Sequence, residues 1–105
     1  MRGNDVIAEI GARLAAVVPL GSRVVLFGSR ARGEAADGSD VDILVIEPEV
    51  VDAAQEAVRL RRELRGLGVP IDMVVIDEAT AARRRVVLGT LVERALREGR
   101  LLVET

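Results

Sequence analysis

The apolar positions of the chain change period several times, and each period predicts a different element. Near the N-terminus they recur at helical spacing. These positions are Val6, Ile10, Leu14 and Val17. A candidate N-cap at Asn4 or Asp5 and a stop at Pro19 predict a helix over residues 5–18.

The rest of the chain alternates between short β-branched runs and longer segments of helical period. The runs predict strands and the longer segments predict helices, with Gly66 and Gly99 as stop signals. The predicted strands cover residues 24–27, 41–46, 71–76 and a short 101–103, and the predicted helices cover 49–65 and 80–98. We find no repeat, linker or low-complexity tract along the chain.

Composition limits the protein to one domain of modest size. The chain has 105 residues, of which 50% are hydrophobic and 30% are charged. This balance predicts a single globular domain over residues 1–105. The chain shows no export signal and no apolar run of spanning length, so we expect a cytoplasmic protein without a membrane segment.

Several reactive residue types are missing, and this narrows the chemistry. The sequence contains no histidine, no cysteine and no lysine, so all 15 basic residues are arginine. Catalysis by imidazole, thiolate or lysine amine is therefore excluded. Phe27 is the only aromatic residue and the net charge is −2, so we expect no direct binding of nucleic acid. Any catalysis must therefore use carboxylates, hydroxyls, arginines or bound metal.

Three aspartates are the first candidates for a site. Asp40 and Asp42 lie at the start of the strand predicted over 41–46, where alternation places both on one face. Asp72 lies on the same face a few ångströms away if the strand predicted over 71–76 pairs with the strand predicted over 41–46. Three carboxylates so close would repel one another unless a divalent cation neutralised them, and oxygen ligands favour Mg²⁺ or Mn²⁺. The alternative is that these residues form no site: Asp40 would cap a turn, Asp42 would be a charge at the end of a strand, and Asp72 would be solvated.

The segment after the first predicted strand is the second candidate. Gly28 permits a tight turn, and Ser29 with the following backbone N–H groups can begin a short anion-binding helix. Arg30 and Arg32 add donors suited to phosphate oxygens. Taken alone, the segment also fits a plain turn with surface arginines. The combination of strand, Gly-Ser, Asp-x-Asp and a later aspartate is more specific than its parts.

Together these residues resemble the signature of the DNA polymerase β-type nucleotidyltransferase superfamily. The stretches "GSRARGEAADGSDVDILVI", Ile71-Asp72-Met73 and "ALREGRLLVE" are most similar to its minimal nucleotidyltransferases, the MNT proteins. The resemblance implies a small α/β nucleotidyltransferase fold with a mixed sheet packed with helices. It also implies ATP as substrate and two Mg²⁺ ions. Proteins of this kind are commonly paired with a helical HEPN-domain protein in toxin–antitoxin modules.

The resemblance and the residue chemistry assign the same roles. Asp40, Asp42 and Asp72 are the expected catalytic and metal-binding residues. The expected nucleotide-binding residues are Gly28, Ser29, Arg30, Arg32 and Ser39. Transfer of AMP to a tyrosine hydroxyl of a HEPN partner is the favoured function. The alternatives are an antitoxin that acts by contact alone and a small-molecule nucleotidyltransferase that needs a separate acceptor-binding subunit. A homo-oligomer is compatible with each.

An apolar strip follows the aspartates along the same face of the predicted strands. Its members are Leu44, Ile46, Val74 and Ile76. The last helix, a second copy or a partner protein could cover this strip. We expect an acceptor protein to dock on it, which would bring its hydroxyl group to the Asp72 side of the site.

Overall fold

The computed structural model describes residues 3–34 and 39–105, and in this part of the chain four helices and four strands alternate. The helices are α1 (Gly3–Ala15), α2 (Ala53–Arg62), α3 (Glu78–Arg84) and α4 (Leu91–Glu98). The strands are β1 (Arg23–Phe27), β2 (Val41–Glu47), β3 (Ile71–Asp77) and β4 (Arg100–Glu104). All four predicted strands are confirmed, each within two residues of its predicted ends.

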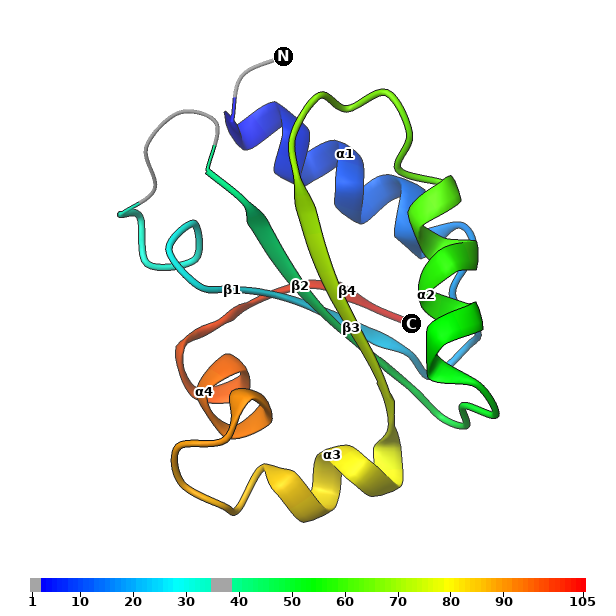
Figure 1. Ribbon diagram of the computed structural model, residues 1–105, viewed down its shortest axis with the longest axis vertical. Coiled ribbons are helices and arrows are strands. Elements are labelled where there is room, and N and C mark those ends of the chain that lie inside the picture. The colour runs from blue at the N-terminus through cyan, green and yellow to red at the C-terminus, as the bar shows by residue number, and fades with distance from the viewer. Residues whose placement is uncertain (1–2, 35–38) are drawn as a thin grey trace.

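The four strands form one mixed sheet in the order β3-β2-β1-β4 (Figure 1). β1 runs antiparallel to both β2 and β4, whereas β2 and β3 are parallel and are connected through α2. The register pairs Asp42 with Phe27 on one side and with Asp72 on the other. The mixed sheet and the α/β fold predicted above are therefore confirmed.

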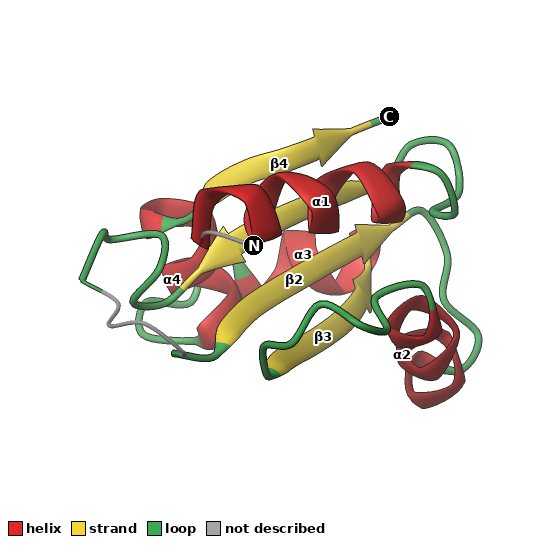
Figure 2. Ribbon diagram, turned by 90° about the horizontal axis from the view of Figure 1, so that it is seen from above, coloured by secondary structure: helices red, strands yellow, loops and turns green. Residues whose placement is uncertain are grey.

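The sheet lies between two layers of helices, with α1 and α2 on one face and α3 and α4 on the other (Figure 2). Neighbouring residues of β2 contribute to both cores because strand side chains alternate. Ile43 and Val45 pack with α1 and α2, and Leu44 and Ile46 pack with α3 and α4. Both faces of β2 are buried, which explains its nearly continuous apolar sequence.

The single helix predicted over residues 80–98 is wrong, because the structure has two helices there. α3 ends at Arg84, and α4 begins after Thr90, whose side chain accepts a hydrogen bond from the N–H of Glu93. Glu93 in turn accepts one from the N–H of Gly89. This reciprocal pattern is a helix start, and Thr90-x-x-Glu93 is its sequence signature. The apolar period continues through the break and conceals it.

The boundaries of the first two helices also differ from the prediction. α1 contains Asn4 and Asp5, so neither is the predicted N-cap. It ends at Ala15, and a hydrogen-bonded turn follows. α2 begins only after Asp52, whose carboxylate accepts a hydrogen bond from the N–H of Gln55. No helix in the described part of the chain is both long enough and apolar enough to cross a bilayer.

The apolar strip behind the aspartates is covered by the chain itself. Leu44 and Ile46 are fully buried, and Ile76 is buried with them under Ala81 of α3 and Val92 of α4. The expected docking of an acceptor on this strip is therefore wrong. The last helical segments fold back over the sheet because they carry the apolar side chains that this face needs.

Candidate active site

The candidate site lies where β1 ends beside the start of β2. Gly28 follows β1 directly and has a φ of 76°, in the left-handed region that favours glycine. Its α-carbon lies against the side chain of Asp42, because a Cβ built at Gly28 would overlap the Asp42 carboxylate. The glycine is thus needed both for the turn and for the space that Asp42 occupies.

The parallel register of β2 and β3 brings two predicted site residues together. Asp42 and Asp72 are direct partners across these strands, so their side chains emerge on the same face. Asp42 is half-buried and Asp72 is exposed. Burial, the negative charges of Asp72 and Asp40, and a hydrogen bond with Asp72 raise the pKa of Asp42, against the opposing effect of Arg32. The negative charge of Asp72 thus acts on Asp42, as expected if β3 lies beside β2.

Asp40 lies just before β2, and its side chain is exposed. Its charge acts on Asp42. However, no three His, Cys, Asp or Glu side chains of the described residues are grouped so that they could hold a metal ion together. The pair of Asp42 and Asp72 still fits Mg²⁺, because this ion is commonly held by one or two carboxylates and completed by substrate phosphates and water. The part of Asp40 in such a site stays a prediction.

The segment after Gly28 forms a hydrogen-bonded turn instead of the short helix predicted there. The N–H groups of Ala31 and Arg32 both donate to the carbonyl of Gly28, and the N–H of Glu34 donates to the carbonyl of Ser29. Ser29 is half-buried, and its hydroxyl makes no hydrogen bond within the described residues. The turn therefore presents a hydroxyl group that is ready for a ligand.

The two arginines of the turn have different surroundings. The guanidinium of Arg30 donates to the carbonyl of Ser39 at 2.6 and 3.1 Å, which connects the two sides of the segment before β2. Arg32 forms ion pairs with Glu34 at 3.1 Å and with Glu98 of α4 at 3.7 Å. Residues 35–38, between these anchor points, lie outside the described residues. Arg30 thus has a structural role that its sequence position did not reveal.

A pocket of about 320 Å³ lies between the turn after β1, the start of β2 and α4. Gly28, Ser29, Arg32 and Asp42 line one side, and α4 supplies the other. The residues from α4 are Leu91, Arg94, Ala95 and Glu98. The volume lies at the lower end of the range of small-molecule sites. An anionic ligand here would meet the Ser29 hydroxyl, the guanidinium groups of Arg32 and Arg94, and the carboxylate of Asp42.

The sequence reasoning missed Arg94 and Glu98. They are four residues apart on α4 and so share a helix face, which the sequence does show. That this face closes the pocket depends on how α4 packs against β1, and no local pattern encodes this. Ser39, which was predicted to bind nucleotide, is half-buried beside Arg30 and does not line the pocket.

Comparison with known proteins identifies the family of the chain. Residues 8–102 match the family model of the nucleotidyltransferase domain. A solved structure described as a minimal nucleotidyltransferase is 33% identical, with a TM-score of 0.62 and coverage of 95% of each chain. A protein from Sulfolobus solfataricus described as a nucleotidyltransferase is 26% identical, with a TM-score of 0.64, over 95% of this chain and 78% of that one.

A third solved structure shares the fold at lower identity. It is a toxin–antitoxin with AMP-PNP, 22% identical, with a TM-score of 0.66, over 94% of this chain and 73% of that one. No curated protein matches the chain. The family model spans nearly the whole sequence, and the fold agrees with it throughout. The chain therefore belongs to the nucleotidyltransferase domain family.

Proposed function

We propose that this protein transfers AMP from ATP to a hydroxyl group of a partner protein and acts as the antitoxin of a toxin–antitoxin pair. The observation that carries the proposal is the pocket shared by Ser29, Asp42 and Arg94, with Asp72 beside Asp42 on the next strand. Membership in the nucleotidyltransferase family supports the reaction type. The likeness to a toxin–antitoxin structure with AMP-PNP supports the setting.

The pocket residues have the chemistry to hold a triphosphate. The Ser29 hydroxyl can donate to a phosphate oxygen, and the guanidinium groups of Arg32 and Arg94 can offset the negative charge of the β- and γ-phosphates. Asp40, Asp42 and Asp72 would hold the Mg²⁺ ions. When bound, these ions neutralise the phosphate oxygens and lower the repulsion between the carboxylates.

The transfer itself needs one base and one leaving group. The acceptor oxygen forms a bond to the α-phosphorus of ATP, and the bond between this phosphorus and the bridging oxygen of pyrophosphate breaks. Asp72, the more exposed carboxylate of the pair, takes the proton from the acceptor hydroxyl and releases it to water. Arg32 and Arg94 stabilise the charge on the departing pyrophosphate. No covalent enzyme intermediate is required.

The segment between α3 and α4 is the surface from which the acceptor protein reaches this pocket. Val86 and Leu88 are 78% and 83% exposed, and Leu91 lines the pocket itself. Arg84 and Arg85 precede them and form no ion pair within the described residues. This surface fits an acceptor protein that has an apolar patch for the exposed valine and leucine and acidic groups for the two arginines. By family resemblance, we infer a HEPN-domain protein with a tyrosine as the modified residue.

Mass measurement of the partner tests the proposal. The protein is used to isolate its partner, and the pair is incubated with ATP and Mg²⁺ before intact-mass analysis. We expect the mass of one AMP on the partner and none on this chain. Asp72→Asn should abolish the addition, whereas Glu104→Gln, an equal change of charge on β4, should not. Contact without AMP addition would instead favour a non-catalytic antitoxin. Addition to a small molecule alone would favour the third alternative.

A further inference from the structure

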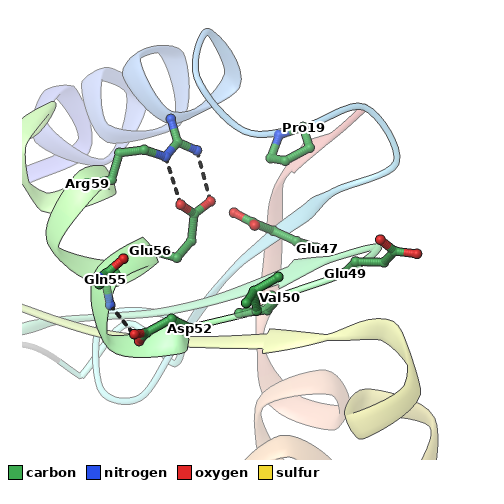
Figure 3. A pocket seen from close by; sticks show the side chains of 9 residues that line it. Pro19, Glu47, Glu49, Val50, Asp52, Gln55, Glu56 and Arg59 are labelled. Atoms are coloured by element: carbon green, nitrogen blue, oxygen red, sulfur yellow. Dashed lines mark hydrogen bonds and ion pairs between the residues drawn. The ribbon is translucent and has the colours of Figure 1, made fainter.

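A second pocket, of about 570 Å³, lies at the other end of β2 (Figure 3). It is formed by the loop after α1, the end of β2, the loop between β2 and α2, and the first two turns of α2. Asp42 is the second residue of β2 and Glu47 is the last, so about 17 Å of strand separates the two sites. None of the predicted catalytic or nucleotide-binding residues lines this pocket.

Glu47 is the unusual residue of the second pocket. Its side chain is only 2% exposed, yet it lines the pocket, and its Oε2 atom has no hydrogen-bond partner within the described residues. Figure 3 shows its carboxylate pointing toward Glu56 and Pro19. A buried carboxylate oxygen without a donor is rare in folded proteins because it loses its hydration without compensation. When Glu47 is ionised, no donor within the described residues reaches this atom.

The neighbouring cation cannot supply the missing donor. Arg59 is held by Glu56, with distances of 2.7 Å from Nε to Oε1 and 2.9 Å from Nη2 to Oε2. Its Nη2 also donates to the carbonyl of Val17 at 3.0 Å. Burial, a side-chain hydrogen bond with Glu56 and the negative charge of Glu56 raise the pKa of Glu47 to about 7, against the opposing effect of Arg59. Arg59 therefore pairs with Glu56, and none of its hydrogen bonds within the described residues reaches Glu47.

The remaining charges around the pocket are acidic. Glu49 and Asp52 also line it, so the described lining residues include four carboxyl groups and one arginine. Asp77, the register partner of Glu47 on β3, accepts a hydrogen bond from the N–H of Thr80. Pro19, Val50 and Val51 give the pocket an aliphatic wall. The ligand that fits is a cation that donates hydrogen bonds and carries an aliphatic chain.

We propose that this pocket binds a primary alkylammonium group, with its N–H groups donating to the carboxylate of Glu47 and its methylene chain on Pro19 and Val50. The group can come from a free polyamine or from a lysine side chain of a bound protein. A metal ion fits less well, because the described residues contain no cluster of three or more ligands. The proposal is independent of the proposed transferase activity.

Calorimetric titration with two probes tests the proposal. Putrescine represents a free polyamine, and a short lysine-containing peptide represents a protein side chain. Saturable binding of putrescine alone assigns a polyamine site, and binding of the peptide alone assigns a protein contact. The affinity for the probes should be the same with and without MgCl₂ at matched ionic strength, because none of the predicted Mg²⁺ ligands lines this pocket. If neither probe binds in the millimolar range, or if Mg²⁺ competes equally, the proposal is wrong.

Two comparisons assign the binding to Glu47. Glu47→Gln should weaken the probe about tenfold or more, the effect of losing a charged hydrogen-bond partner. Glu104→Gln, a control at an exposed residue, should leave the affinity unchanged. In the unmodified protein, binding should weaken at pH 5 relative to pH 8, because Glu47 is protonated there while the ammonium group stays charged. If neither Glu47→Gln nor the change from pH 8 to pH 5 alters the affinity, Glu47 does not bind the probe.

Discussion

Gly28 and Asp42 are packed so closely that no larger residue can replace the glycine without moving the carboxylate. The Cβ of an alanine at position 28 would overlap Oδ2 of Asp42 and lie 3.2 Å from its Cγ. The turn after β1 and the start of β2 therefore meet at a point where an added Cβ would require the Asp42 side chain to move. This contact couples the two halves of the predicted signature.

A pair of glycine substitutions measures this coupling. Gly33 also has a positive φ, of 73°, but an added Cβ there meets nothing within 4 Å. Gly33→Ala should cost only the backbone strain, about 1–2 kcal/mol. Gly28→Ala should cost more and should also abolish binding of Mg²⁺ and a non-hydrolysable ATP analogue. Urea denaturation and calorimetry measure the two effects, and equal losses in both variants would exclude the contact with Asp42.

Asp42→Asn separates stability from ligand binding. Burial and the charges of Asp72 and Asp40 raise the pKa of Asp42, so removing its charge should slightly raise the melting temperature of the protein without ligands. The same change should weaken Mg²⁺-dependent nucleotide binding about tenfold or more, because a metal ligand is lost. Thermal melts with and without Mg²⁺ and the ATP analogue decide this. Unchanged stabilisation by the ligands would remove Asp42 from the site.

Ser29→Ala tests whether the turn after β1 binds phosphate. Because the hydroxyl makes no hydrogen bond within the described residues, its removal should leave the fold intact. Binding of the triphosphate should weaken by about 1–3 kcal/mol, the range for a hydrogen bond to a charged group. AMP lacks the β- and γ-phosphates and should bind both forms equally. An equal loss for AMP and for the ATP analogue would assign Ser29 to another part of the nucleotide.

The pair of Glu47 and Glu56 should make stability depend on pH in two opposite ways. The pKa of Glu47 is raised from 4.5 to about 7, chiefly by burial, and that of Glu56 is lowered to about 2, chiefly by its hydrogen bond with Arg59. Between pH 4.5 and 7 the folded state holds the Glu47 proton more tightly, so stability should fall as the pH rises. Below pH 4.5, the stabilisation from ionised Glu56 should be lost as the pH falls.

Glu47→Gln should remove only the first of these effects. We expect it to raise the free energy of unfolding at pH 8 by about 1–3 kcal/mol and to change it little at pH 4.5. Urea denaturation at pH 4.5, 6 and 8 measures this difference. Parallel stability curves for the variant and the unmodified protein would show that the pKa of Glu47 is not raised in solution.

The exposed segment between α3 and α4 should matter for the acceptor but not for the nucleotide. Leu88 is 83% exposed, so Leu88→Ser should cost little stability. It should lower the rate of AMP addition to the partner severalfold and leave the affinity for the ATP analogue unchanged. Leu20→Ser, at an equally exposed leucine in the loop after α1, is the control. If both variants slow the reaction alike, the segment is not the docking surface.

Several features of the fold and site follow from local sequence. The β-branched runs predict the strands because strand period and propensity depend on near neighbours. The glycine after β1 predicts the turn that its φ confirms, whereas the placement of Asp40 and Asp42 on one face stays a prediction, because β2 begins only at Val41. The absence of histidine, lysine and cysteine limits catalysis to carboxylates, hydroxyls, arginines and bound metal. Each of these conclusions needs only a few adjacent residues or the composition.

Other features were decided by contacts between distant segments. Asp72 reaches Asp42 because β3 pairs in parallel with β2, and Arg94 reaches the pocket because α4 packs against β1. The apolar strip on β2 and β3 is closed by α3 and α4, which moves the exposed apolar surface to residues 86–88. Glu47 is left without a donor because Arg59 is held by Glu56. Strand register, helix packing and the choice of ion-pair partner depend on which surfaces meet in the folded chain, and the local period of a sequence carries no record of that.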